Sequence, residues 1–205
     1  MLPLKRLWLA RKFAGSPWHH LFEAYKGEEV IAIDTETTGL DPRRADVLTI
    51  AAVPIRGRRV LTSQRLELTL QASPRLTGDS IRIHGLRHQD LSAGLTQKEA
   101  LERLLGFIQN RPLLGYHVRF DIALLSRLTK EHLGFELPNR HIELAHIYRS
   151  RQLRKNPDIE PHLGFEQMAT HLRVPLLARH TAFGDALTTA LMYLALQPEQ
   201  SLSNR

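Results

Sequence analysis

The segment IAIDTETTGLDP, residues 31–42, ends an apolar run with two carboxylates that could hold a metal ion. Asp34 and Glu36 are two positions apart, and alternate side chains of a β-strand point to one face, so both project into the same space. Neighbouring carboxylates repel each other unless they are protonated, hydrogen-bonded or bridged by a cation, and a divalent cation relieves the repulsion best. The pair therefore indicates either a metal site or an ordinary solvated acidic pair.

The same D-x-E pattern occurs a second time in a different setting. Asp158 and Glu160 lie in RKNPDIEPH, residues 154–162, which Pro157 and Pro161 mark as a linker rather than a strand. We therefore interpret the second pair as solvated. The pattern alone is not evidence of a site, and its position at the end of a strand is what distinguishes the first pair.

Two further aspartates occupy the first turn of a predicted helix. Asp121 follows Phe120 and the short apolar strand LLGY, and Asp185 lies in the first turn of FGDALTTALMYLAL. Exposed amides and the helix dipole keep a carboxylate ionised at such a position. His180 precedes Asp185 by five residues, outside the helix, and an imidazole titrates near neutral pH, which suits it to accept a proton from water. Taken singly, each has an ordinary explanation as a first-turn acid or a surface histidine.

Together, four carboxylates and one imidazole are the groups that two-metal hydrolysis of a phosphodiester requires. The chain contains no cysteine, which excludes thiolate metal sites, and oxygen ligands favour Mg²⁺ or Mn²⁺. The sequence therefore predicts a hydrolytic site with divalent cations.

The excess of basic residues is consistent with a polyanionic partner but does not by itself indicate one. Lys and Arg number 28 against 21 for Asp and Glu, a net charge of +7, which favours nucleic acid but also fits a solvated basic surface. No apolar stretch approaches the roughly 18 residues of a membrane helix. The absence of cysteine suits a reducing compartment, and we expect a cytoplasmic protein.

The chain divides into three predicted parts. Residues 1–28 begin with MLPLKRLWLARKF, which resembles a basic amphipathic helix that either packs on the domain or docks to a polymerase or other protein partner. An organelle presequence remains an alternative. Residues 29–197 form the predicted catalytic domain, and residues 198–205 a short tail.

Within the domain, strands precede alternating strands and helices. A turn at Gly57 joins the second and third of the early strands, a polar loop follows, and a capping box of Thr96 and Glu99 begins the first helix of the domain. The expected strands are 30–34, 46–55, 59–70 and 113–116, and the expected helices are 96–110, 120–133, 141–153, 163–173 and 180–196. This order predicts an α/β fold with a mixed β-sheet flanked by helices.

Three stretches in this order, DTETTGLD, GYHVRFD and HTAFGD, resemble the motifs of the DEDDh (DnaQ-like) 3′-to-5′ exonucleases, which include the proofreading epsilon subunit of bacterial DNA polymerase III and stand-alone relatives. The likeness spans about Glu29 to Leu196. It implies a ribonuclease H-like fold, two divalent metal ions and a general base. The implied metal ligands are Asp34, Glu36, Asp121 and Asp185, and the implied base is His180.

The resemblance also implies substrate contacts around the first motif. Thr37, Thr38 and Leu40 would cradle the terminal nucleotide, and His84 in IHGL would touch the substrate or serve as a turn residue. Many members have His-Asn before the third acid, whereas this chain has Tyr116 and His117, which leaves the contact of that Asn in doubt.

The expected function is a metal-dependent 3′-to-5′ exonuclease that releases nucleoside 5′-monophosphates from single-stranded nucleic acid, with DNA favoured, in DNA repair or replication. One alternative is an exonuclease for RNA or short oligoribonucleotides. Another is a polymerase-associated, nucleic-acid-binding subunit with weak activity.

Overall fold

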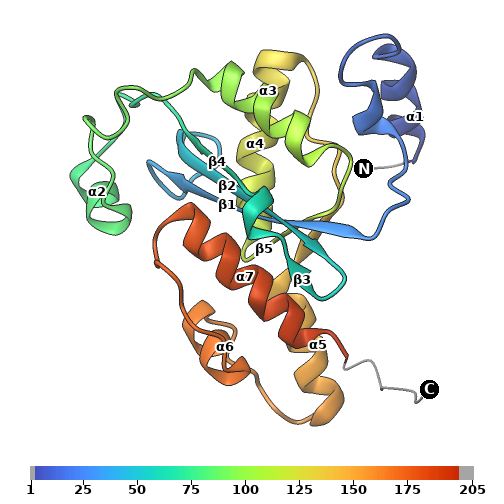
Figure 1. Ribbon diagram of the computed structural model, residues 1–205, viewed down its shortest axis with the longest axis vertical. Coiled ribbons are helices and arrows are strands. Elements are labelled where there is room, and N and C mark those ends of the chain that lie inside the picture. The colour runs from blue at the N-terminus through green and yellow to red at the C-terminus, as the bar shows by residue number, and fades with distance from the viewer. Residues whose placement is uncertain (1–2, 199–205) are drawn as a thin grey trace.

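A mixed sheet forms the centre of the protein in the computed structural model, which describes residues 3–198 (Figure 1). The central strand β1 pairs antiparallel with β2 on one side and parallel with β5 on the other. The strand order is β3-β2-β1-β5-β6, and β4 also pairs with β2. The strands are β1 (Glu29–Thr37), β2 (Val47–Arg56), β3 (Arg59–Val60), β4 (Leu66–Thr69), β5 (Leu113–Gly115) and β6 (His141–Glu143).

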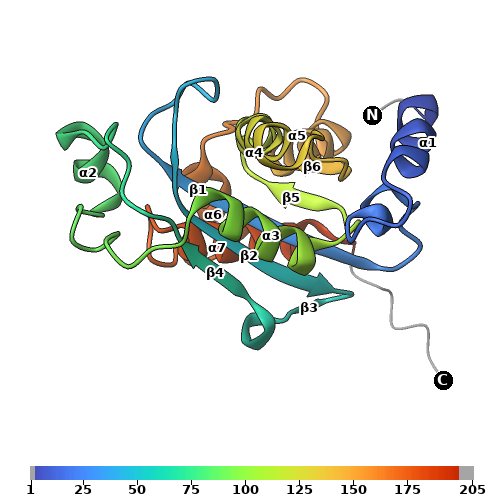
Figure 2. The same ribbon diagram turned by 90° about the horizontal axis from the view of Figure 1, so that it is seen from above.

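Helices cover both faces of the sheet, as Figures 1 and 2 show from two directions. Ile31 and Ile33 of β1 point into a core with α3 and α4, whereas Ala32 between them points into a second core with α5, α6 and α7. The helices are α3 (Gln97–Ile108), α4 (Val118–Leu133), α5 (Leu144–Lys155), α6 (Phe165–Leu172) and α7 (Ala182–Leu196). The predicted α/β arrangement of a mixed sheet between helices is confirmed.

Two local sequence signals, a capping box and a turn glycine, form the structures that they predict. Thr96 accepts a hydrogen bond from the Glu99 amide while the Glu99 carboxylate accepts one from the Thr96 amide, so the capping box begins α3. Gly57 adopts a φ of 57° in the turn between β2 and β3, a conformation that glycine adopts without strain.

The strand expected over residues 59–70 is interrupted by a three-residue 3₁₀ turn, Thr62–Gln64. Leu61 donates its amide hydrogen to the Pro54 carbonyl at 2.8 Å, but Pro54 has no N–H to return to the partner strand. The ladder therefore breaks at Pro54, and β3 and β4 pair with different parts of β2.

Two short elements were not predicted. The expected polar loop contains α2 (Gly78–His84), capped by Thr77 and Ser80 and ended by Gly85 in the left-handed region. The first three residues of the expected helix 141–153 form β6, and α5 begins at Leu144. β6 is held by parallel pairing with β5, a tertiary contact that local sequence does not reveal.

The segment that carries α2 is closed at its base. Leu70 and Leu95 form an isolated parallel bridge, and hydrogen bonds of 2.9 and 2.8 Å join Gln71 to Leu95 and Leu95 to Thr69. Gly94 lies against the Leu70 backbone, where a Cβ atom would collide with the carbonyl group. Residues 71–94 therefore leave the sheet and return to almost the same point.

The N-terminal helix α1 (Pro3–Lys12) packs on the core through Leu9, and the Arg6 guanidinium donates a 2.8 Å hydrogen bond to the Phe22 carbonyl. Its outer face exposes Leu4, Leu7 and Trp8, with exposures of 82, 54 and 58%. α1 and α2 lie at opposite ends of the molecule in Figures 1 and 2. No helix within residues 3–198 is long and apolar enough to span a membrane, and most of the predicted tail, residues 199–205, lies outside the described part.

Gly115 joins β5 to α4 at a point where a side chain would collide. A Cβ atom there would lie 2.8 Å from Val118 Cγ2 and 3.2 Å from the Ile33 carbonyl oxygen. We predict that Gly115→Ala lowers the free energy of unfolding by roughly 1–3 kcal/mol, measured by urea denaturation. Gly106→Ala is the control, because nothing lies within 4 Å of its Cβ position in α3, and it should stabilise by about 0.5–1 kcal/mol. Equal stabilities of the two variants would contradict this account.

Candidate active site

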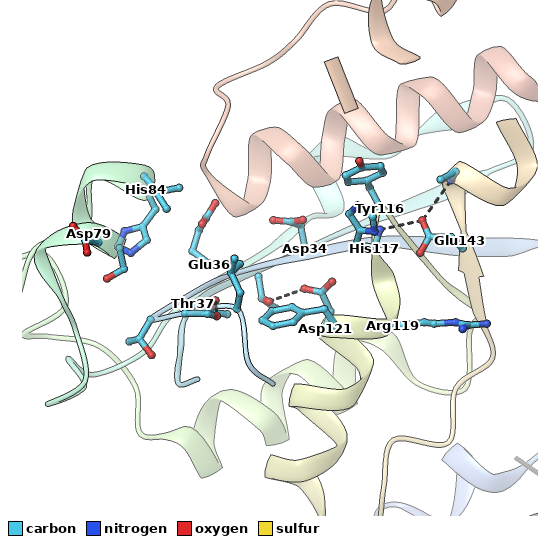
Figure 3. Close-up of a pocket in the computed structure, with 18 of the residues that line it drawn as sticks. Asp34, Glu36, Thr37, Asp79, His84, Tyr116, His117, Arg119, Asp121 and Glu143 are labelled. Atoms are coloured by element: carbon cyan, nitrogen blue, oxygen red, sulfur yellow. Dashed lines mark hydrogen bonds between the residues drawn. The ribbon is translucent and has the colours of Figure 1, made fainter. Parts of the chain in front are cut away.

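A cavity of about 800 Å³ opens at the carboxyl ends of β1 and β5. Ligands in open α/β sheets bind at this kind of edge. Figure 3 shows acidic side chains in the middle of the cavity, α2 on one side, and the first turns of α4 and α5 on the other. The lining residues labelled there are Asp34, Glu36, Thr37, Asp79, His84, Tyr116, His117, Arg119, Asp121 and Glu143.

Three of the predicted acids meet at this edge. β1 continues through Thr37 rather than ending at Asp34 as expected, so Asp34 and Glu36 share the face that α7 covers. Asp185 lies in the first turn of α7, as predicted. One carboxylate oxygen from each of these three residues lies within 4.8 Å of the others, a spacing that a shared cation can bridge.

Asp121 reaches the cluster from the opposite face of the sheet. It lies in the first turn of α4, as predicted, and is 4% exposed. Thr35, which points away from its neighbours Asp34 and Glu36, donates a 2.6 Å hydrogen bond from its hydroxyl to Asp121 Oδ1 (Figure 3). The residue between the two acids thus orients the third acid, a role that the sequence analysis missed.

The acids strongly affect one another's protonation. Burial raises the pKa of Asp34 well above its usual value, and the charges of Asp121, Asp185 and Glu36 raise it further. Burial, followed by the charge of Asp185, raises the pKa of Glu36 to about 7. Burial also raises the pKa of Asp121 to about 7, although the Thr35 hydrogen bond opposes this. The cluster therefore resists full ionisation unless positive charge enters it.

Asp185 has one oxygen paired and the other without a protein partner. Its Oδ2 accepts hydrogen bonds from the Arg179 guanidinium and from the His180 amide, the latter at 3.3 Å, whereas its Oδ1 is buried and has none. A buried oxygen without a partner beside two other carboxylates fits a divalent cation, which takes oxygen ligands. The donor set therefore fits the predicted kind of metal.

His180 is not brought into this cluster. Its side chain is exposed and lines a smaller neighbouring cavity of about 250 Å³, which shares Glu36 and His84 with the larger one. His180 adopts a φ of 61° in the loop before α7. His180 and Glu36 thus line one small cavity, His180 is not among the residues that line the main cavity, and its role as a base stays a prediction.

The predicted substrate residues differ in what their side chains do. Leu40 is 90% exposed at the rim of the cavity. The Thr37 hydroxyl donates to the Gly39 carbonyl at 2.8 Å, and the Thr38 hydroxyl accepts from the Asp46 amide at 3.0 Å, so both hold the loop in shape. These contacts leave Leu40 as the member that faces solvent at the rim.

His84 is buried at the end of α2, and burial lowers its pKa. Its Nδ1 accepts the Leu86 amide hydrogen at 3.0 Å, so the neutral ring carries its proton on Nε2. This Nε2 atom is buried without a partner in a residue that lines the cavity, which leaves one donor for a substrate acceptor.

Glu143 is a further residue that the sequence analysis missed. Its carboxylate accepts hydrogen bonds of 3.0 Å from the amides of both His117 and Val118, where His117 adopts a left-handed φ of 54° (Figure 3). This contact holds the first turn of α4, and with it Asp121, against the start of α5. His117 itself is exposed at the cavity wall, so its side chain is open to a ligand.

The raised pKa values predict a pH dependence of stability in chelator. Below their ordinary pKa values, Glu36 and Asp121 are protonated in both the folded and the unfolded protein, and their contribution to the free energy of unfolding is fully present. This contribution is lost as the pH rises towards about 7, because the acids of the unfolded chain ionise first. Glu36→Gln, whose amide does not titrate, should flatten this fall and be more stable than wild type at pH 8. Urea denaturation from pH 5 to 8 measures it. The exposed Glu160→Gln is the matched control and should keep the wild-type slope.

Comparison with known proteins identifies the family. The exonuclease family model RNase_T matches residues 31–193. A DNA polymerase III PolC-type protein of Thermotoga petrophila is 22% identical over 83% of this chain and 12% of its own length. The DNA polymerase III subunit epsilon of Aquifex aeolicus is 22% identical over 82% of this chain and 80% of its own length.

Solved structures show the same fold. An E. coli exonuclease I complex with a dT13 oligonucleotide has a TM-score of 0.69 at 17% identity, over 82% of this chain and 40% of that one. A zinc-bound E. coli exonuclease I complex with single-stranded DNA has a TM-score of 0.73 at 16% identity, over 85% of this chain and 41% of that one. The chain thus spans less than half of exonuclease I and about an eighth of the PolC-type relative. It has a ribonuclease H-like fold and belongs to the exonuclease family.

Proposed function

We propose that the chain is a metal-dependent 3′-to-5′ exonuclease that hydrolyses phosphodiester bonds at the 3′ end of single-stranded nucleic acid, with DNA favoured. The observation that carries the proposal is the half-buried carboxylate cluster of Asp34, Glu36 and Asp185, joined by Asp121. Asp34, Glu36 and Asp121 line a cavity of about 800 Å³. Membership of the exonuclease family supports it. Nucleoside 5′-monophosphates are the proposed products.

The four acids are the proposed ligands of two divalent cations, Mg²⁺ or Mn²⁺. Such cations would supply Lewis-acid stabilisation to the attacking and leaving oxygens of a phosphodiester displacement. The chain's own contribution is to position the ligands: Thr35 orients Asp121, and the Arg179 and His180 contacts orient Asp185 with Oδ1 free. Because Thr35 and the His180 amide hold these carboxylates before a substrate binds, the carboxylates themselves need little reorganisation.

His180 is the proposed general base. Its place beside Glu36 in the neighbouring cavity, and its exposed side chain, let it turn towards a substrate without moving the sheet. A neutral imidazole nitrogen can accept the proton that the attacking water loses.

The walls of the cavity fit the end of a nucleic acid strand. Leu40, in the loop after β1, and Ile83, on α2, both line the cavity. Their exposures are 90 and 58%, and they offer apolar surface to a base. The free Nε2 donor of His84 lies in the same wall and would hydrogen-bond to a phosphate or sugar oxygen. The oligonucleotides in the exonuclease I complexes support single-stranded DNA as the substrate here, and the epsilon relatives support a role in replication or repair.

The first test is digestion of 3′- and 5′-labelled single-stranded DNA and RNA with Mg²⁺, Mn²⁺ or chelator, resolved on gels. Wild type should shorten strands from the 3′ end only with a divalent cation, and the DNA and RNA arms reveal the sugar preference. Asp34→Asn should abolish shortening, because it removes a charged ligand at the centre of the cluster.

The second D-x-E provides the matched control for this test. Asp158 is exposed and lies outside the cavity, so Asp158→Asn should digest at the wild-type rate. Full activity of Asp34→Asn would show that the site is assigned to the wrong residues. Absence of digestion by wild type on every substrate would favour a nucleic-acid-binding role instead.

His180→Ala should lower the digestion rate by about 10²- to 10⁴-fold while leaving cation binding intact, as loss of a general base does. The rate is measured under single-turnover conditions across pH 6 to 9. His88→Ala, an exposed histidine on the segment after α2, is the control and should match wild type. An unchanged pH–rate profile in His180→Ala would exclude His180 as the base.

A partner site on the N-terminal extension stays a prediction, as does a cytoplasmic location. α1 exposes Leu4, Leu7 and Trp8 at the end of the molecule away from α2, which suits contact with a polymerase or another protein. Loss of exonuclease activity after serine substitution of Leu7 and Trp8 would show that α1 serves the nuclease instead.

A further inference from the structure

The guanidinium of Arg179 lies beside the carboxylate cluster. It forms an ion pair with Asp185 Oδ2, and its side chain is only 25% exposed. The guanidinium also lies over the Phe165 ring, 4.5 Å from the ring centre, which shields one of its faces from water. Arg179 is therefore a partly buried cation in direct contact with one of the proposed metal ligands.

The loop that carries Arg179 is held firmly against α7. Thr181 donates from its hydroxyl to the Ala178 carbonyl at 2.7 Å, and the Leu177 amide donates to the Thr188 hydroxyl at 3.2 Å. A Cβ atom at Gly184 would collide with the Leu177 and Ala178 carbonyls. Only a glycine at position 184 allows this approach, so the backbone directs the Arg179 side chain towards Asp185.

The charge of Arg179 acts on the whole cluster. It lowers the pKa of Asp34 and of Glu36, opposing the effects of burial and of the neighbouring acids. A divalent cation placed among the same carboxylates would experience this charge as repulsion. The guanidinium and a cation would therefore neutralise the same acids, and the presence of one weakens the binding of the other.

Arg179 has a second acidic partner within reach. Its Nε lies 3.7 Å from Glu166 Oε1, and the Glu166 side chain is 59% exposed. Nε makes no hydrogen bond, so it is free to strengthen this contact. The guanidinium can thus move from Asp185 to Glu166 while it stays stacked on Phe165 of the same helix, α6.

We propose that Arg179 competes with the divalent cation for Asp185 and so sets the cation affinity of the site. The guanidinium holds Asp185 until a cation binds, and it then shifts to Glu166. This inference rests on the proposed metal-dependent function. It makes Arg179 a positioning residue that tunes metal occupancy. A variant that lacks the Arg179 charge should therefore bind the metal ion more tightly.

The test is calorimetric titration of Mn²⁺ into the full chain at pH 8, comparing wild type with Arg179→Gln. Removing a unit charge about 5 Å from a divalent ion is expected to tighten binding by a factor on the order of ten, even at the dielectric constant of water. Arg179→Lys keeps the charge and should stay close to wild type. Arg154→Gln, an exposed residue on α5, is the matched control and should not differ from wild type.

Thermal unfolding in chelator at pH 8 provides a second readout. Arg179→Gln should have the lower melting temperature, because the acids then lack their counter-charge, and Mn²⁺ should raise that temperature more than in wild type. Equal or weaker Mn²⁺ binding by Arg179→Gln would overturn the inference while leaving the metal site intact. Absence of Mn²⁺ binding in both proteins would overturn the metal site itself, and the inference with it.

Discussion

The repulsion among four closely placed acids is the interaction on which the rest of the site depends. Asp34 and Glu36 come from the central strand, and Asp121 and Asp185 come from helices on opposite faces of the sheet. Burial, and then the charges of neighbouring acids, raises the pKa of Asp34, Glu36 and Asp121, a free-energy cost that the folded domain must offset. The cores on both faces of β1 supply that stability, because buried apolar side chains surround the strand just before the acids begin.

Specific neighbours moderate this repulsion. The Thr35 hydroxyl binds Asp121, and the Arg179 guanidinium and His180 amide bind Asp185. Each neighbour uses one oxygen of a carboxylate, and at Asp185 the other oxygen is left without a protein partner. The site is therefore arranged to keep its carboxylates oriented while it retains a strong demand for positive charge.

The acids were predictable from sequence because their signals are local. Strand alternation places Asp34 and Glu36 together, and a helix start identifies Asp121 and Asp185, so the structure agrees with both expectations. Likewise, Asp158 and Glu160 are exposed, as their proline-bounded segment indicates.

What escaped prediction depends on contacts between distant segments. Thr35 meets Asp121 across 86 positions of sequence, and Glu143 meets His117 across 26. β6 exists only because β5 pairs with it, and the orientation of His180 depends on the packing of its loop against α7. The helix α2 is short and lies in polar sequence, so its local signals were limited to the capping residues Thr77 and Ser80 and the terminating Gly85.

The closed base of the segment 71–94 has an evolutionary consequence. Leu70 and Leu95 meet in a bridge, so the end of β4 and the start of α3 are held close together independently of residues 71–94. The segment can then lengthen, shorten or be replaced during evolution without changing the register of β4 or the position of α3. Since it carries α2, one wall of the cavity can diversify while the carboxylates on β1 stay where they are. The α2 wall of the cavity and the carboxylates on β1 thereby belong to structurally separable parts of this chain.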